Sequence, residues 1–179
     1  MTSTQEFTEF AQAVSPRLLR TAFLLCGDWH TSEDLAQATL ATVFASWRRV
    51  SQHPVAQAYA IRILVNTYLS GQRRKRPREI LTDRLPDRAA DPASPEERIV
   101  VLAALATLPP KSRAVVVLRY WADLSVDQVA EVLGCSAGNV KSQSARALDK
   151  LRPVLGEAMK GIAATPSSDE VQKGGAHRG

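Results

Sequence analysis

A group of polar side chains follows a short turn inside residues 125–151, which read SVDQVAEVLGCSAGNVKSQSARALDKL. Two runs with apolar residues at helical spacing flank the break LGCS, which is the outline of a helix-turn-helix. Ser136 opens the second run, whose outward side carries Gly138, Asn139, Ser142, Gln143 and Arg146, with Lys141 at its flank. In the major groove, amide side chains pair with adenine edges, Arg pairs with guanine, and Lys contacts phosphates. The stretch therefore predicts a helix that reads duplex DNA, with a solvated amphipathic hairpin as the alternative.

A second group of cations ends the segment AQAYAIRILVNTYLSGQRRKRPRE, which begins at residue 56. The apolar residues at helical spacing are Tyr59, Ile63, Leu64 and Tyr68, and the cations are Arg73, Arg74, Lys75, Arg76 and Arg78. Cations attract the phosphate backbone, and aromatic rings stack on unpaired bases. The segment predicts a second nucleic-acid surface, suited to a melted strand, unless the run is only a solvated helix end.

No motif for catalysis or metal binding accompanies these two groups. Gly-rich phosphate loops and nucleophile motifs are absent, and His30, His53 and His177 are scattered. Cys26 and Cys135 have no second ligand at a suitable spacing, so we expect neither a disulfide nor a structural zinc. We therefore expect a protein that is not an enzyme and uses no cofactor.

The net charge of +5 favours a polyanionic partner. The N-terminus MTSTQEFTEF lacks the basic and then apolar pattern of a signal peptide. No apolar run approaches the roughly 18 residues that a membrane span needs. These features predict a cytoplasmic protein without membrane insertion.

The elements that must position both groups are predicted to be helices. Alternation typical of strands is nearly absent, and even VVVLRYW at 115–121 fits a helical period. We predict an all-α fold with two small helical domains, at residues 7–78 and 94–155. A flexible acidic linker, rich in Pro, Asp and Ala, would join them at 79–93, and residues 156–179 would form a disordered tail.

Capping residues and apolar stripes predict where individual helices begin and end. One helix should begin with Ser94 as N-cap, Pro95 in the first position and Glu97 in a capping box, and Pro109-Pro110 should end it. Another should begin at Thr31, three residues before Asp34. The core stripe of that second helix is expected to consist of Leu40, Val43, Phe44 and Trp47. Gly134 suits the left-handed conformation at the turn.

In order along residues 7–153, three segments resemble those of the bacterial extracytoplasmic-function (group 4) sigma factors of RNA polymerase. LLRTAFLLCGDWHTSEDLAQATLATVFASW is similar to regions 2.1 and 2.2, and YAIRILVNTYLSGQRRKR to regions 2.3 and 2.4. ALATLPPKSRAVVVLRYWADLSVDQVAEVLGCSAGNVKSQSARALDKLR is similar to region 4 nearly end to end. The resemblance implies a promoter-specificity subunit built from the σ2 and σ4 domains.

The resemblance also implies partners and roles for particular residues. Asp34, Leu35 and Gln37, on the outward start of their helix, would dock on the β′ clamp helices of core RNA polymerase. Arg62 and Asn66, with the loop SQHPVAQ, would read and hold open the −10 element, and Arg73, Arg74, Lys75 and Arg76 would hold the DNA backbone. Region 4 would grip the β flap and read the −35 element. An anti-sigma factor would be a further partner.

Several residues depart from the family pattern. Ala38 stands where the family usually has Glu, and Ser70 occupies a common Asp position. Gln143 and Ser144 replace the usual Arg-Leu pair, which implies an altered −35 preference and weaker apolar packing of the helix. Two other functions remain open: a self-standing helix-turn-helix regulator acting as a dimer, and a sigma-mimicking adaptor that binds polymerase without reading DNA.

Overall fold

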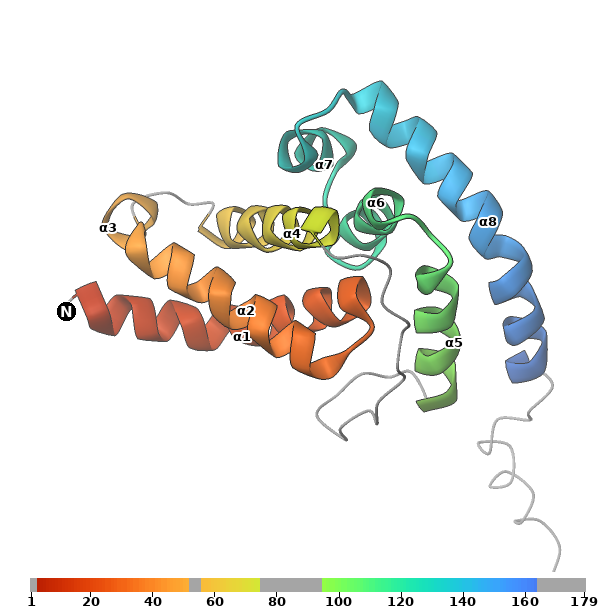
Figure 1. The fold of residues 1–179 in the computed structure, drawn as a ribbon, viewed down its shortest axis with the longest axis horizontal. Helices are drawn as coiled ribbons and strands as arrows, with labels where there is room; N and C mark the ends of the chain where they lie inside the picture. Colours follow the sequence, from red (N-terminus) through yellow and green to blue (C-terminus); the bar gives the residue numbers. More distant parts are fainter. Residues whose placement is uncertain (1–2, 52–55, 75–94, 164–179) are drawn as a thin grey trace, which may run out of the picture.

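The computed structural model describes residues 3–51, 56–74 and 95–163, and every regular element in these ranges is an α-helix (Figure 1). The N-terminal bundle consists of α1 (Ser3–Cys26), α2 (Trp29–Ala45), α3 (Trp47–Val50) and α4 (Ala56–Arg74). The C-terminal bundle consists of α5 (Pro95–Ala106), α6 (Pro110–Tyr120), α7 (Val126–Leu133) and α8 (Ala137–Ala163). The predicted all-α fold class is confirmed for the described residues.

In the N-terminal bundle, α1, α2 and α4 pack against one another, and α3 lies at one end. The core stripe of α1 is Val14, Leu18, Ala22 and Leu25, each at most 1% exposed. Their spacing of three and four residues places them on one face of the helix. Gly27 then reverses the chain with a φ of +70°, a conformation that costs Gly little because it has no Cβ.

The structure corrects three expectations for α2. The helix begins at Trp29 rather than Thr31, because the Asp28 carboxylate accepts a hydrogen bond from the Thr31 backbone N–H at 2.7 Å. Phe44, expected in the core stripe, is 51% exposed, and its ring contacts that of Phe7, with centroids 4.8 Å apart. Leu35, expected on the outward side, is 8% exposed and belongs to the core.

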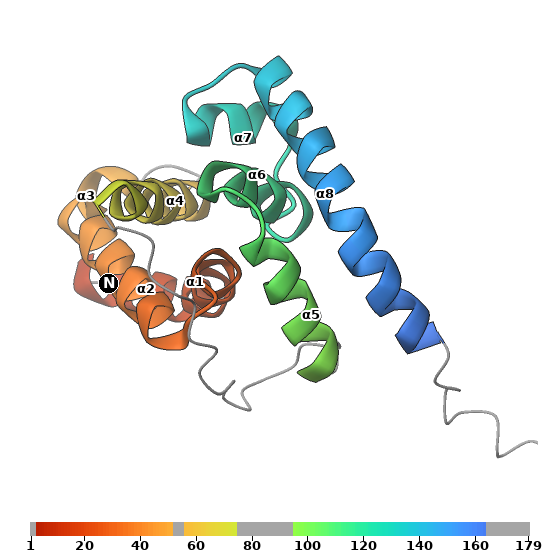
Figure 2. The ribbon, with the colours of Figure 1, turned by 45° about the vertical axis from the view of Figure 1, so that its right-hand side comes forward.

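In the C-terminal bundle, α8 runs alongside α5 and α6 and also packs on α7 (Figure 2). Pro95 is the first residue of α5, as predicted, whereas its expected cap Ser94 lies outside the described residues. The Pro pair separates α5 from α6, with Pro110 in the first turn of α6. α8 continues to Ala163, eight residues past the expected end of the fold at 155.

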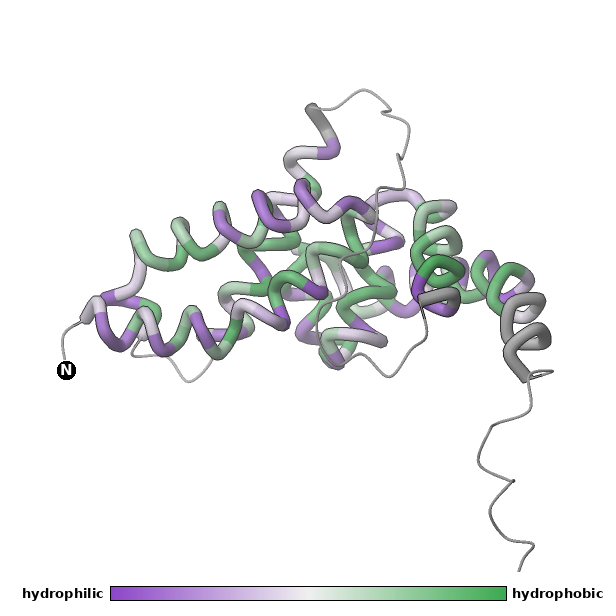
Figure 3. Tube along the Cα trace, turned by 90° about the horizontal axis from the view of Figure 1, so that it is seen from below, coloured by the Kyte–Doolittle hydropathy of each residue, from purple (hydrophilic) through white to green (hydrophobic). Residues whose placement is uncertain are grey.

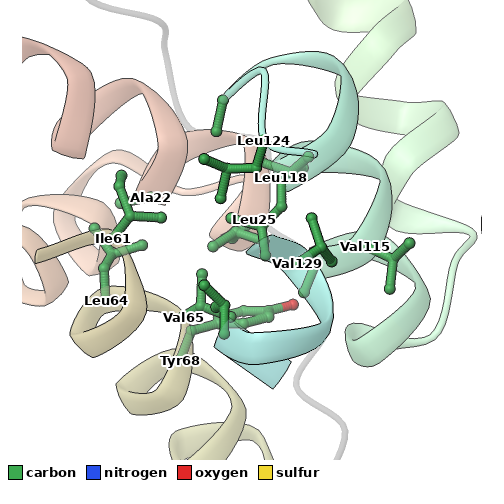
Figure 4. Packing of buried hydrophobic residues seen from close by; sticks show 14 of the residues in the cluster. Ala22, Leu25, Ile61, Leu64, Val65, Tyr68, Val115, Leu118, Leu124 and Val129 are labelled. Carbon is green, nitrogen blue, oxygen red and sulfur yellow. The ribbon is translucent and has the colours of Figure 1, made fainter. Parts of the chain in front are cut away.

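The two bundles are in contact and share one apolar core. Most helices carry both apolar and polar residues along their length, as the hydropathy colours show (Figure 3), whereas α5 is apolar from Ile99 to Ala106. Val65 and Tyr68 of α4 lie in the same cluster as Leu25 of α1 and Leu118 and Val129 of the C-terminal bundle (Figure 4). The segment predicted as a linker, 79–93, lies outside the described residues.

Candidate nucleic-acid interface

The turn between α7 and α8 is built from local hydrogen bonds. Ser125 caps α7 in a capping box: its Oγ accepts from the Gln128 N–H at 3.1 Å, and Gln128 Oε1 accepts from the Ser125 N–H at 2.8 Å. Gly134 has a φ of +61°, which confirms the left-handed turn predicted at this position. The Cys135 N–H closes the turn by donating to the Ala130 carbonyl at 3.0 Å. The turn of the helix-turn-helix is thus held by hydrogen bonds between residues that are close in sequence.

The first turn of α8 is capped by Ser136, as predicted. Its Oγ accepts a hydrogen bond from the Asn139 N–H at 3.2 Å. The inward side of α8 consists of Val140, Ser144, Ala147 and Leu151, all buried. This stripe fixes the rotation of the helix, so the side chains on the opposite side face away from the bundle.

The outward surface of α8 carries the residues that the sequence predicted for it, and we call this surface the α8 face. Gly138, Asn139, Lys141 and Arg146 are exposed, and Ser142 and Gln143 are half-buried. A Cβ on Gly138 would meet only Ser136 Oγ, at 4.0 Å, so packing within the chain does not require Gly there. A small residue at this position lets the helix approach another molecule closely.

Two amide side chains on the α8 face are joined to each other. Gln143 Nε2 donates a hydrogen bond to Asn139 Oδ1 at 2.6 Å, across one turn of the helix. One lone pair of Asn139 Oδ1 is therefore used within the chain, while Gln143 keeps its carbonyl oxygen and one N–H for another partner. A free acceptor and a free donor on one amide match the N6 and N7 atoms of an adenine edge.

Ser144 interrupts the apolar stripe of α8. The residue is 8% exposed, and its Oγ has no hydrogen-bond partner among the described residues. A buried hydroxyl without a partner costs about 1–3 kcal/mol relative to a satisfied one. The expectation that Ser144 weakens the packing of this helix agrees with its position.

The second candidate surface lies on α4, and we call it the α4 face. Arg62 and Asn66 are exposed and lie one turn apart on the same side of the helix. Arg73 and Arg74 are the last two residues of α4. Lys75, Arg76, Arg78 and residues 52–55 of the preceding loop lie outside the described residues.

The Arg62 guanidinium has a partner in the other bundle. Its Nη1 lies 3.7 Å from the Glu131 carboxylate of α7, and both side chains are about half or more exposed, at 49% and 76%. An ion pair this accessible to water contributes little to stability. It does show that the α4 face borders the helix-turn-helix.

Two cations near the α4 face were missed by the sequence reasoning. Arg48 and Arg49 are exposed on α3, which ends just before the loop that leads to α4. The two adjacent arginines in the sequence WRRV could have indicated these cations. The prediction used this segment only for Trp47, the last residue of the apolar stripe. Arg48 and Arg49 add two exposed cations just before the loop that leads to α4.

A third surface lies on α2. Asp34 and Gln37 are exposed, and with exposed Ala38 and Ala41 they follow the i, i+3, i+4, i+7 spacing of one helix face. Leu35, named with them from the sequence, is buried and so does not belong to this face. Because two of the four side chains are methyl groups, a partner helix can approach the α2 backbone closely.

The described residues offer neither a metal-binding cluster nor a membrane-spanning helix. Within 3–51, 56–74 and 95–163, no three His, Cys, Asp or Glu side chains gather as a metal ion would need. None of the helices in the described part has both the length and the apolar character to cross a membrane. In the described part of the chain, neither Cys26 nor Cys135 forms a disulfide, and each is half-buried.

Comparison with known proteins gives two family matches in chain order. Residues 10–78 match Sigma-70 region 2, and residues 98–151 match Sigma-70 region 4. The chain is 37% identical over 152 residues to the RNA polymerase sigma-E factor of Streptomyces coelicolor, covering 84% of this chain and 86% of that protein. It is 33% identical to the ECF RNA polymerase sigma factor SigE of Mycolicibacterium smegmatis, covering 82% of this chain and 60% of that one.

The fold also resembles a solved structure. The sigma factor RpoE of Bartonella quintana, crystallised with the anti-sigma factor NepR, aligns with a TM-score of 0.70 at 22% identity, over 85% of this chain and 98% of that one. The alignment therefore spans both bundles. Together with the two family matches and the sigma-E relative, this establishes that the chain belongs to the extracytoplasmic-function group of the sigma-70 family of RNA polymerase sigma factors.

Proposed function

We propose that this chain binds core RNA polymerase and directs promoter-specific initiation by reading a −35 and a −10 element and helping to open the DNA. The observation that carries the proposal is the α8 face, a capped recognition helix with its polar side exposed, in a chain that also contains region 2. A helix presented in this way suits the major groove of a duplex.

In this proposal the α8 face reads the −35 element. Arg146 contacts a guanine, Gln143 an adenine, and Lys141 the phosphates, while Gly138 permits close approach. The Ser136 hydroxyl is already engaged as the helix cap, so its role is to orient the first turn. The family's usual Arg at position 143 is replaced by an amide, which favours a change of base preference at one position.

The α4 face and the cations beside it serve the −10 element. Arg62 and Asn66 contact bases, while Arg73, Arg74, Lys75 and Arg76 hold the backbone of the opened strands. Arg48 and Arg49 add backbone contacts next to the loop, because they are exposed on the helix that precedes it. Tyr68 of α4 is buried and serves packing rather than base stacking, whereas Tyr59 on the same helix is half-buried.

Core polymerase is the partner of the α2 surface in this proposal. Asp34 and Gln37 supply the polar contacts with the β′ clamp helices, and Leu35 contributes only by holding α2 against α1 and α4. The C-terminal bundle contacts the β flap. The proposed setting is the cytoplasm, and the protein supplies binding and positioning, while polymerase supplies the chemistry.

An anti-sigma factor is a further proposed partner. The structurally similar Bartonella protein was solved with one. The resemblance in fold supports a partner of this kind and does not identify it.

The experiment that tests the function mixes the purified protein with promoter duplex, with and without core polymerase. The proposal predicts weak binding by the protein alone and tight, sequence-specific binding with polymerase. Tight specific binding without polymerase would contradict it in favour of a self-standing regulator. Polymerase binding that opens no promoter would favour an adaptor.

A further inference from the structure

Four aromatic rings meet where the first turns of α1 lie against α2 and α3. Phe7 contacts the other three: its ring centroid lies 4.8 Å from that of Phe44, 5.3 Å from that of Trp47 and 6.4 Å from that of Phe10. The centroids of Phe10 and Trp47 lie 4.9 Å apart. Separations in this range are those of aromatic pairs that stabilise a fold. We call these four residues the aromatic cluster.

The aromatic cluster attaches the first turns of α1 to the rest of the bundle. Within residues 3–13, every side chain is exposed except Phe7, Phe10 and Ala11, which are half-buried. The core stripe of α1 begins only at Val14. The first three turns of the helix are therefore held to the bundle mainly through the two rings.

The short helix α3 depends on the same cluster for its position. It has four residues, and its N-cap Ser46 makes no side-chain capping bond. A single helical turn is not stable in water by itself, so contacts with the rest of the chain must hold it. Two of its side chains, Trp47 and Val50, are buried. The indole N–H of Trp47 has no hydrogen-bond partner in the described part of the chain, so ring packing sets its orientation.

The exposed side of α3 carries cations next to the proposed −10 contacts. Arg48 and Arg49 follow Trp47 directly and face water. Val50 ends α3 and Ala56 begins α4, six residues later (56 − 50), so the two ends lie at most about 22 Å apart even in extended chain. The loop to α4 starts from the end of α3 (Figure 1). A shift of Trp47 would therefore move both cations and the start of that loop together.

We propose that Phe7 and Phe10 are positioning residues for −10 recognition. Their rings hold Trp47, and α3 with it, so that Arg48, Arg49 and the start of the loop meet the DNA strands that α4 contacts. The inference rests on the proposed function and goes beyond it, because in it neither ring touches DNA or polymerase. Its physical basis is that ring contacts from α1 supply the stability that a helix of one turn lacks.

The alternative is that the two rings only keep the first turns of α1 in place. The two roles differ in what a substitution changes. Loss of a purely structural ring lowers the stability of the protein. Loss of a positioning ring also changes how strongly the polymerase complex distinguishes an intact −10 element from a scrambled one.

The test removes one ring and compares it with a matched ring on the same helix. Phe7→Ala removes a half-buried ring that lies 5.3 Å from Trp47 at an interplanar angle of 76°. The control, Phe23→Ala, removes a half-buried ring that lies 5.8 Å from Trp29 at 66°. Phe23 is sixteen residues further along α1 (23 − 7), or about 24 Å from Phe7. Phe7→Tyr keeps the ring and serves as the rescue variant.

The first measurement reports the environment of Trp47 in the free chain, without polymerase. With Trp29 and Trp121 replaced by Phe, Trp47 is the one tryptophan left, because the sequence contains three. Its fluorescence should be that of a buried indole. Phe7→Ala should shift the emission to longer wavelength and increase quenching by acrylamide, whereas Phe7→Tyr and Phe23→Ala should leave both unchanged.

The second measurement is promoter opening on templates with an intact or a scrambled −10 element, with core polymerase in excess so that affinity for it does not limit opening. We expect Phe7→Ala to lower opening of the intact promoter roughly 5- to 30-fold, because contacts with neighbouring rings are lost. The ratio of opening between the intact and scrambled templates should fall as well, while preference for the −35 element should not change. Phe7→Tyr and Phe23→Ala should open the promoter nearly as well as the wild-type protein.

Phe10→Ala is a second variant that leaves Phe7 in place. It should change the Trp47 emission and the promoter opening in the same direction as Phe7→Ala. It provides the same comparison if Phe7→Ala does not fold.

Three results would overturn the inference. Equal losses of opening in Phe7→Ala and Phe23→Ala would mean that the ring contributes only general stability. A shifted Trp47 emission with unchanged opening would mean that the position of α3 does not govern −10 recognition, and an unchanged emission would mean that the ring does not hold Trp47. If the wild-type protein opens no promoter with core polymerase, the proposed function fails and the −10 role fails with it, while the emission still shows whether the rings hold α3.

Discussion

The α8 face and the α4 face differ in what holds them in place. The α8 face depends on contacts close in sequence, namely the Ser136 cap, the bond between Asn139 and Gln143, and an inward stripe on its own bundle. The α4 face lies on a helix that packs against the other bundle, and Arg62 has its ion-pair partner there. In our account the first face is positioned by its own bundle alone, whereas the second is positioned partly by the neighbouring bundle, through the pair between Arg62 and Glu131.

The largest effect should come from the cations of the α4 face. Replacing Arg73, Arg74, Lys75 and Arg76 with Gln removes four phosphate contacts and should lower promoter opening roughly 100-fold or more at physiological salt. The slope of log affinity against log salt for a −10 fork template should fall by about three. Binding of polymerase without DNA should be unchanged.

A control for total charge replaces four exposed cations elsewhere, Arg20, Lys111, Lys150 and Arg152, with Gln. These residues lie outside both faces, so the control should retain most promoter opening. Equal losses in the two variants would mean that net charge, rather than the α4 face, governs opening.

The next effect concerns Arg146 on the α8 face. Arg146→Ala should reduce −35-dependent transcription by an amount equivalent to about 1–3 kcal/mol, because a guanine contact is lost. Lys150→Ala, a change one turn further along α8, serves as the matched control and should have a smaller effect. The same loss on a promoter with a scrambled −35 element would argue that Arg146 supports folding or backbone contact instead.

A smaller effect should show whether Asn139 and Gln143 recognise DNA bases independently or as a hydrogen-bonded pair. If Asn139 holds the Gln143 amide in position, Asn139→Ala and Gln143→Ala should each weaken preference for adenine at one −35 position, and the double variant should lose little more than either. A double-mutant cycle on base preference should give a coupling of roughly 0.5–2 kcal/mol. Additive losses would mean that the two amides act independently.

The smallest effect should be on stability alone. Ser144→Ala removes a buried hydroxyl without a partner and should raise the free energy of unfolding by about 1 kcal/mol, measured by thermal or urea denaturation. Ser142→Ala, on the outward side of the same helix, is the control and should leave stability nearly unchanged. Loss of stability in Ser144→Ala would show that the hydroxyl has a partner, such as a bound water.

The sequence predicted those features that depend on neighbouring residues. The turn at Gly134, the cap at Ser136 and the start of α5 at Pro95 follow from local chemistry that acts over one or two helical turns. The residues of the α8 face could be predicted from the sequence, because Val140 and Ala147 mark the inward side of the helix and helical spacing then defines the outward side.

Features that depend on distant parts of the chain were not predictable in this way. The bond between Arg113 and Leu25 joins residues 88 positions apart, and nothing local to either one indicates it. Leu35 was placed on the outward side by resemblance, although its apolar character fits the buried position that the structure gives it. The Asp28 cap was missed because Thr31 offered an equally good capping signal two residues beyond the true start of α2.

The central claim is that this protein recognises a promoter at two elements and does so together with core polymerase. The most direct measurement is permanganate reactivity of unpaired thymines at the −10 element, with core polymerase present, on promoters whose −35 or −10 element is scrambled. Our account predicts strong reactivity on the intact promoter, and a large loss when either element is scrambled or polymerase is omitted. Reactivity that is independent of both elements, or that appears without polymerase, would contradict it.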